Sequence, residues 1–316
     1  MNIKLPAIIV MIALVLSACD RDRHVPLRIG TNVWPGYEPL YLARHMGLLN
    51  KNRLQLVEYP SATEVMRAFR NNAIDAASLT LDEALLLRQD NIPIKVVLVH
   101  DISNGGDVIV ARPKIRNMRD LKGMAVAIEA SALGSMVISR ALQINNMSVA
   151  DLKIVRADVD AHENLYAKGA VDAVVTFEPV RTKLLKLGAK EIFTSKEIPD
   201  EIVDVLVVRE EFLKKNTGYI VELVNAWFKA LDFMAKDMEK SAEIMSGRLK
   251  IGKDEVKASY AGLLMPDRQK NISLLYGDDA GLNKSLKKIH SALVEHRLLH
   301  PDVSVDGLLY GGFVKQ

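Results

Sequence analysis

The chain contains a single cysteine, Cys19, whose position points to covalent chemistry on its thiol. It follows a positively charged start, 1–4, and an apolar run, 5–16, which together are typical of a secretory signal peptide. The apolar run is shorter than the roughly 20 residues that a membrane-spanning helix needs. A lone cysteine has no intramolecular disulfide partner, and a free thiol is a liability in an exported protein. We therefore expect a covalent attachment at Cys19.

The residues around this cysteine indicate what is attached. The boundary LSAC (16–19) resembles the lipobox of bacterial lipoproteins, in which the cysteine is acylated and becomes the mature N-terminus. We predict a signal peptide over 1–18, lipid such as palmitate on Cys19, and a tether over 19–26; the alternative is an ordinary signal peptide with a stray cysteine. Two or more acyl chains anchor a protein stably. Asp20 resembles an inner-membrane retention signal, which implies the periplasmic side of that membrane rather than the outer membrane or the cell surface.

The other side chains favour binding over catalysis. The sequence contains no GxSxG, HExxH, P-loop or GxGxxG motif, and its seven histidines lack the spacing of metal ligands. We therefore expect no catalytic residues, no metal and no cofactor. Asp204 is the acid that most suggests a ligand, because it interrupts the apolar run VDVLVV (203–208). An unpaired carboxylate is costly in such a strand unless a positive group meets it.

Length and charge narrow the class of protein. A chain of 316 residues suits one large domain or two lobes of ordinary size. The formal net charge is only +3, and no basic cluster has aromatic residues interleaved, so nucleic acid is not an expected partner. No repeat or low-complexity linker separates independent modules. We expect one cooperative unit and a monomer.

Short β-rich runs alternate with amphipathic helical stretches from Leu27 onward, which is typical of an α/β fold with largely parallel sheets. We predict strands over 27–32, 54–58, 74–79, 94–100, 106–112, 124–128, 153–157, 171–176, 190–194 and 203–209. Helices lie between them, one of them starting at a capping box formed by Ser61 and Glu64. After Arg209 the pattern is almost entirely helical, over 210–215, 217–246, 253–263 and 279–298, with a late apolar segment at 305–314.

This order predicts two lobes. The first comprises 27–110 plus 204–316, and the second comprises 111–203. The chain crosses between them within 105–113 and 201–210, both strand-like. Two crossover strands make a hinge about which a ligand can close the lobes, and the cleft between lobes is a natural ligand site.

Five segments together resemble the periplasmic substrate-binding proteins of the nitrate/sulfonate/taurine type, within the wider group that includes thiamine-pyrimidine synthases. They are RIGTNVWPGYEPLYLAR (28–44), FRNNAIDAASLTLDEALLL (69–87), NMRDLKGMAVAIEASALGSMVISRAL (117–142), AKGAVDAVVTFEPVRTKLL (167–185) and VDVLVVREEFLKKN (203–216). The resemblance implies the two-lobed, type II periplasmic-binding-protein fold. The synthases carry a cysteine-rich motif that this chain lacks, which disfavours an enzyme.

In that family the ligand lies in the interlobe cleft, against the carboxyl ends of strands and helix N-termini, where backbone N–H groups bind anions. The resemblance implies ligand contacts from Trp34, Gly36, Tyr37, Ser78, Leu79, Thr80, Asp101, Ser131, Leu133, Gly134, Ser135, Glu178 and Asp204.

Each assignment has a structural alternative. Trp34 and Tyr37 could pack beneath the first helix instead. Ser131 could be an N-cap, and Glu178 could be an acid in the first turn of a helix, which the helix dipole favours. Asp82 with Glu83 most simply occupies a helix start for the same reason.

The resemblance implies the capture component of an ATP-driven importer, which presents a small polar organic solute, sulfonate/taurine-like or pyrimidine-like, to an ABC permease. The alternative is a sensor subunit that signals to a membrane receptor, since both roles require only lobes that close.

The acids near the inferred cleft favour a ligand that carries an amine or amidine, with or without an acidic group at its other end. They are Asp101, Glu178, Asp204 and Glu38, and no Lys or Arg falls among the inferred contacts. Charge-assisted hydrogen bonds would hold such a cation. In taurine-type relatives an aspartate that resembles Asp204 meets the ligand's amino group. The alternative is that these acids pair with Arg or Lys from elsewhere in the fold.

Overall fold

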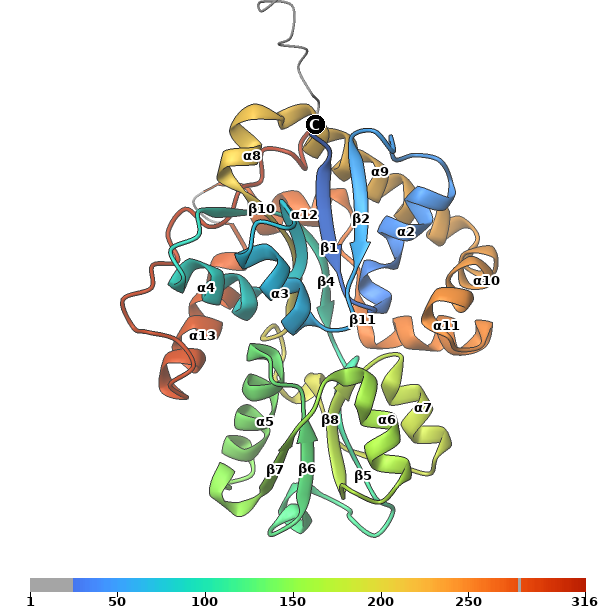
Figure 1. The fold of residues 1–316 in the computed structure, drawn as a ribbon, viewed down its shortest axis with the longest axis vertical. Coiled ribbons are helices and arrows are strands. Elements are labelled where there is room, and N and C mark those ends of the chain that lie inside the picture. The colour runs from blue at the N-terminus through green and yellow to red at the C-terminus, as the bar shows by residue number, and fades with distance from the viewer. Residues whose placement is uncertain (1–24, 278–279) are drawn as a thin grey trace, which may run out of the picture.

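Two β-sheets, one in each of two lobes, organise the computed structural model, which describes residues 25–277 and 280–316 (Figure 1). The predicted signal peptide, the lipidation at Cys19 and most of the predicted tether lie outside the described residues. Within the described ranges, no helix has both the length and the apolar character needed to cross a membrane.

Lobe 1, residues 25–103 with 203–277 and 280–316, is built on a six-stranded sheet. Its order is β11 (Leu263–Leu264), β4 (Ile94–Ser103), β10 (Val203–Arg209), β3 (Ala76–Thr80), β1 (Leu27–Thr31) and β2 (Leu54–Glu58). Strand β1 runs parallel to β2 and β3, whereas β10 is antiparallel to both β3 and β4. Strand β3 is buried along its whole length, as expected for a strand covered on both faces.

Nine α-helices accompany this sheet among the described residues. They are α2 (Glu38–His45), α3 (Ala62–Arg70), α4 (Leu81–Gln89), α8 (Glu210–Lys215), α9 (Thr217–Lys236), α10 (Met238–Leu249), α11 (Lys253–Ser259), α12 (Arg268–Leu275) and α13 (Leu282–Glu295). Helices α3 and α4 lie in front of the sheet in Figure 1. Helix α3 begins where the sequence predicts, because the Ser61 hydroxyl accepts a hydrogen bond from the Glu64 amide at 3.3 Å.

Lobe 2, residues 107–194, is built on a five-stranded sheet. Its order is β7 (Lys153–Arg156), β6 (Ala125–Ile128), β8 (Ala173–Phe177), β5 (Asp107–Ala111) and β9 (Lys190–Thr194). Its helices are α5 (Ala132–Ile144), α6 (Val159–Ala167) and α7 (Val180–Lys186). The predicted α/β, two-lobed fold class is therefore confirmed.

The segments between the lobes differ from the predicted crossover strands. Strand β5 pairs only with β8 and β9 of lobe 2, and β10 pairs only with β3 and β4 of lobe 1. The second sheet therefore already begins at Asp107, before the boundary predicted after residue 110. The chain crosses in two non-strand segments, 104–106 and 195–202. In the first of them, Gly105 and Gly106 separate β4 from β5.

Other differences concern the C-terminal half. The helix predicted over 217–246 is two helices, because the Asp237 side chain accepts a hydrogen bond from the Lys240 amide at 2.9 Å and starts α10. Helix α12 was not predicted, although Asp267 caps it in the same way. The predicted segment 305–314 consists of turns with one isolated bridge to β4.

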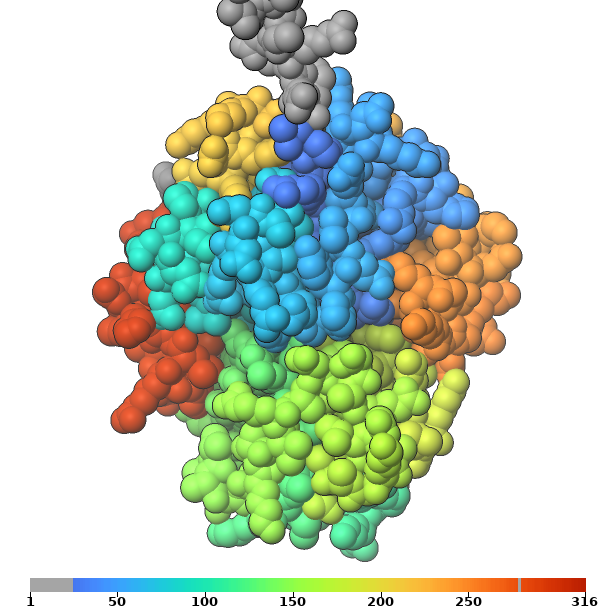
Figure 2. Space-filling view, in the orientation of Figure 1, coloured from blue at the N-terminus to red at the C-terminus, as the bar shows by residue number. Residues whose placement is uncertain are grey.

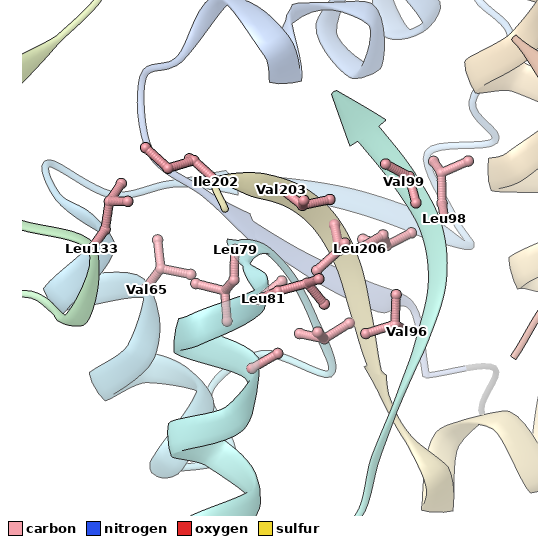
Figure 3. Packing of buried hydrophobic residues seen from close by; sticks show 14 of the residues in the cluster. Val65, Leu79, Leu81, Val96, Leu98, Val99, Leu133, Ile202, Val203 and Leu206 are labelled. Carbon is pink, nitrogen blue, oxygen red and sulfur yellow. The ribbon is translucent and has the colours of Figure 1, made fainter. Parts of the chain in front are cut away.

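The main apolar core extends from lobe 1 into lobe 2. Figure 3 shows Leu79, Leu81 and Leu206 packed around β3 and β10, with Leu133 of α5 on the side of Val65. In the space-filling view of Figure 2, the surface of lobe 2 lies directly against that of lobe 1. The structure therefore presents the two lobes in contact.

Candidate functional site

A narrow space between the lobes, which we call the interlobe cavity, has a volume of about 20 Å³, roughly enough for one water molecule. Lobe 1 contributes Asn32, Trp34, Tyr37, Ala62, Thr80, Glu83 and Asp204, and lobe 2 contributes Asp107, Glu129, Leu133 and Phe177. Most of these residues stand at the carboxyl ends of parallel strands or at the starts of the helices that follow. In α/β sheets this edge is the usual ligand site.

Two aromatic rings meet across the cavity. Trp34, after β1, contacts Phe177, at the end of β8, edge to face, with ring centroids 5.6 Å apart and planes at 89°. The Trp34 indole N–H also donates a hydrogen bond to Oδ2 of Asp101 at 3.1 Å. Gly36 permits this approach, since a Cβ there would lie 1.8 Å from the same oxygen. The hydrogen bond to Asp101 therefore helps to hold the Trp34 ring in place.

Tyr37 and Asp204 form the second contact of the site. The Tyr37 hydroxyl donates a hydrogen bond to Oδ1 of Asp204 at 2.5 Å. Both side chains are buried, and burial together with the neighbouring Asp101 raises the pKa of Asp204 well above its usual range. Burial and Asp204 likewise raise the pKa of the Tyr37 phenol. The phenol is therefore a donor that faces a desolvated carboxyl group.

Two further acids of lobe 1 stand in the first turn of α4. Glu83 Oε2 accepts a hydrogen bond from the Thr80 amide at 3.1 Å, which starts the helix, but Oε1 has no partner among the described residues. Burial, with Asp82 and Glu129 nearby, raises the pKa of Glu83 to about 8. Burial raises the pKa of Asp82 to about 6.

Lobe 2 adds Asp107 and Glu129 to the same cavity. Asp107 begins β5, and its Oδ2 has no hydrogen-bonding partner among the described residues; neither carboxylate oxygen of Glu129 has one. Burial raises the pKa of each to about 7, and for Glu129 the nearby Ser131 hydroxyl limits the rise. Acids of both lobes thus meet in one desolvated space.

His100 lies behind the cavity and does not line it. Its ring is fully buried between Tyr37 and Trp227, with centroids 5.2 and 4.5 Å away. Its Nε2 lies 3.0 Å from the Ser78 hydroxyl, and burial lowers the pKa of the imidazole to about 3. The ring is therefore neutral, and Ser78 supports it rather than the cavity wall.

The structure brings together five of the thirteen residues that the sequence analysis placed at the ligand. The cavity is lined by Trp34, Tyr37, Thr80, Leu133 and Asp204. The lining does not include the other eight, which are Gly36, Leu79, Ser135, Ser78, Asp101, Ser131, Gly134 and Glu178.

The last three of these have local structural roles. Ser131 caps α5 by accepting a hydrogen bond from the Gly134 amide at 3.1 Å. A Cβ on Gly134 would lie 2.7 Å from the Glu129 carbonyl oxygen, so only glycine fits. The Glu178 carboxylate pairs with Arg181 at 2.7 Å and accepts from the Thr182 hydroxyl at 3.0 Å. The alternative of an N-cap therefore describes Ser131, and the alternative of an acid paired with Arg or Lys describes Glu178.

Sequence reasoning missed Asn32, Ala62, Glu83, Asp107, Glu129 and Phe177 as lining residues. Glu83 was assigned only to its helix start, which is correct but incomplete. Glu129 and Phe177 follow or end predicted strands, so the same rule that selected Trp34 could have selected them. The same rule could not have selected Asp107, because it is the first residue of its strand rather than the last.

Among residues 25–277 and 280–316, no group of three or more His, Cys, Asp or Glu side chains is arranged to hold a metal ion. The acids are instead distributed around an aromatic wall, which suits a small organic molecule.

Solved structures from several bacteria share this fold. The alkanesulfonate-binding protein of Xanthomonas axonopodis pv. citri, bound to MOPS, superposes with a TM-score of 0.73 at 17% identity, covering 87% of this chain and 94% of that one. The periplasmic aliphatic sulphonate binding protein of Escherichia coli gives 0.73 at 17% identity, covering 92% and 99%. The periplasmic nitrate-binding protein of Synechocystis gives 0.69 at 14% identity, covering 88% and 83%. These similarities confirm the predicted periplasmic-binding-protein fold.

Sequence comparison supplies the family. No curated protein matches the chain. The profile of the NMT1-like family matches residues 20–247, which is well over half of the chain. This match, with the sulfonate- and nitrate-binding structures above, confirms the resemblance that the five segments indicated. The chain therefore belongs to the NMT1-like family.

Proposed function

We propose that this protein is the lipid-anchored, solute-binding component of an ABC importer on the periplasmic side of the inner membrane. It captures a small polar organic solute in the interlobe cavity and presents it to a permease. The observation that carries the proposal is the cavity itself, which is lined by residues from both lobes. A solute larger than water enters or leaves it only when the lobes separate.

The segments between the lobes support such a motion. At the first crossing, the Gly105 amide donates a hydrogen bond to the Ser195 hydroxyl of the second crossing at 2.6 Å, and the Ser103 and Ser195 hydroxyls lie 2.8 Å apart. Gly105 has a φ of 115°, which only glycine adopts readily. Hydrogen bonds thus join the two crossing segments side by side, as expected for a hinge made of two segments of the chain.

Contacts outside the cavity hold the lobes together. Arg140 of α5 forms a two-pronged ion pair with the buried Glu201, at 2.7 and 2.9 Å, and Lys288 of α13 reaches the same carboxylate at 3.0 Å. Lys186 of α7 pairs with Glu255 of α11 at 2.5 Å. The Lys186 side chain is largely exposed, and an ion pair of that kind is individually weak, so it allows the lobes to open when the cavity is empty.

The direction of β1 suits the proposed anchor. Its carboxyl end, Thr31, points to the cavity, so its first residue, Leu27, stands at the far edge of lobe 1. A lipid on Cys19 would therefore attach the protein by the side opposite lobe 2. The cleft would remain free to open.

The named relatives bind small solutes, alkanesulfonate and nitrate, in the same fold. We test the proposal without assuming a ligand. The mature domain is incubated with a small-molecule extract of the producing cells, separated by rapid gel filtration, denatured and analysed by mass spectrometry. We expect one solute to be retained near equimolar amounts, and Trp34→Ala to lose it, whereas Leu187→Ala, on the exposed surface of lobe 2, keeps it. Retention of no solute contradicts the proposal.

Import is tested separately. Cells that lack the protein should take up the retained solute more slowly than cells that carry it. Equal uptake by both would contradict an importer role while leaving solute binding intact.

A further inference from the structure

The charge of the interlobe cavity indicates its solute, if the proposed function is correct. Acidic side chains from both lobes line it: Glu83 and Asp204 from lobe 1, Asp107 and Glu129 from lobe 2. Each is at most 4% exposed. Acids without a counter-charge are costly in a desolvated space, so each must either keep its proton or meet a positive partner.

The described residues do not supply a positive partner within the cavity. Neither Lys nor Arg of residues 25–277 and 280–316 lines it. Elsewhere in the described chain, two buried acids are neutralised directly, because Arg181 pairs with Glu178 and Arg248 pairs with Glu38, both at 2.7 Å, whereas the buried Asp82 and Asp101 have no ion-pair partner. The two acids that the sequence analysis had added to the cation site, Glu178 and Glu38, are therefore already paired.

Residues that line the same space also carry unmade hydrogen bonds. Oε1 of Glu83, Oδ2 of Asp107 and both carboxylate oxygens of Glu129 are buried without a partner among the described residues. Buried polar atoms in native proteins are normally satisfied, so orphan groups beside a cavity call for a partner, and a ligand donor is one. These atoms belong to both lobes, so one ligand would satisfy both only while the lobes are closed.

We propose that the solute is an organic cation, with N–H donors on a protonated amine or an amidinium, that bridges Glu83 and Asp204 of lobe 1 to Asp107 and Glu129 of lobe 2. Charge-assisted hydrogen bonds to carboxylates are short and strong. The Trp34 and Phe177 rings offer π-faces and apolar surface to the rest of the cation. A nitrate or alkanesulfonate, by contrast, would meet carboxylates from both lobes.

The same acids make closure depend on the cation. With the cavity empty and the acids ionised, like charges on the two lobes repel, which favours separated lobes. A bound cation removes the repulsion and adds hydrogen bonds from both sides. Cation binding and lobe closure are therefore coupled.

The test compares ligand charge directly. Isothermal titration calorimetry and thermal melts of the mature domain are recorded with putrescine, agmatine and benzamidine, and with nitrate, ethanesulfonate and magnesium ion, at up to about 10 mM. We expect at least one of the three organic cations to bind and raise the melting temperature, and the anions and magnesium to have no effect. Binding of an anion or magnesium alone, or no response to any of the three cations, overturns the inference.

Variants test the named acids. Glu129→Gln and Asp107→Asn keep side-chain size but remove the charge, and each should weaken cation binding about 10- to 100-fold. Without a ligand each should melt at the same or a higher temperature, since an unpaired buried charge is lost. Glu163→Gln, an exposed acid of lobe 2, is the control and should change neither property. Unchanged cation affinity in both cavity variants overturns the inference.

These outcomes are separable from failure of the proposed function. If the extract yields a retained solute that proves to be an anion, the protein remains a solute-binding protein and only the cation inference fails.

Discussion

The Trp34 ring of lobe 1 meets the Phe177 ring of lobe 2 edge to face, with centroids 5.6 Å apart, so the wall of the cavity exists only when the lobes are together. Both rings are nearly buried, although each stands at the end of a strand. Closing the lobes therefore buries apolar surface as well as acids. This contact should contribute to the affinity for any solute that the closed form encloses.

Phe177→Ala tests that contribution. The change removes the aromatic pair and part of the apolar wall, and we expect the affinity for the retained solute to fall about tenfold, from typical aromatic pair energies. Calorimetric titration measures the effect, with Leu187→Ala as the control on the same lobe. Equal affinity in Phe177→Ala and the native domain would show that the wall does not contact the solute.

Tyr37→Phe tests the hydrogen bond to Asp204. It leaves a buried carboxyl oxygen without its donor, and we expect the free energy of unfolding to fall by about 1–3 kcal/mol. Urea denaturation measures the loss, and Tyr310→Phe, an exposed tyrosine of lobe 1, is the matched control. Adding Asp204→Asn to Tyr37→Phe should recover part of the loss, because a neutral amide tolerates burial better. A stability loss equal in the control and in Tyr37→Phe would refute the role of this bond.

Lobe opening should depend on pH. In the structure with the lobes in contact, burial raises the pKa values of the cavity acids Asp107 and Glu129 to about 7 and that of Glu83 to about 8. A carboxyl group whose pKa is higher when closed binds its proton more tightly there, so low pH favours closure. Raising the pH through 7 to 8 ionises these groups and favours opening.

The acids that face one another in this region are Asp82, Glu83, Asp101, Asp107, Glu129 and Asp204, with the Tyr37 phenol and the neutral His100 beside them. Small-angle scattering of the empty domain should give a larger radius of gyration at pH 9 than at pH 6. The double variant Asp107→Asn, Glu129→Gln should reduce the change. A radius independent of pH would contradict the electrostatic coupling.

The anchor is tested at Cys19. Replacing it with serine removes the thiol that the acyl chain requires, and we expect the protein to move from the membrane to the soluble periplasmic fraction. Fractionation followed by immunoblotting measures the distribution, with native protein as the reference. Retention of Cys19→Ser in the membrane would refute lipid anchoring at this residue.

The fold could be predicted largely from the sequence because strand and helix periodicity are local properties. The predicted 54–58 strand coincides with β2, and the 203–209 strand coincides with β10. The C-terminal helices were less predictable, because one polar cap at Asp237 divides a long amphipathic pattern. The pattern on either side of that cap continues to suit a single helix.

The site was less predictable, because its acids look ordinary in sequence. Glu83 suits a helix start whether or not it also faces a cavity, and Asp107 opens a strand. Only the meeting of the lobes makes these two acids neighbours of Glu129 in one space. The pairing of Glu178 with Arg181 could have been read from their spacing, whereas that of Glu38 with Arg248 depends on the tertiary fold.

The most direct test of the central claim, that a solute is enclosed between two lobes that close upon it, is small-angle scattering of the mature domain at pH 9 with and without the solute retained from the cell extract. We predict a smaller radius of gyration with the solute bound, with the change occurring about the crossings 104–106 and 195–202. An unchanged radius of gyration at saturation would contradict the claim.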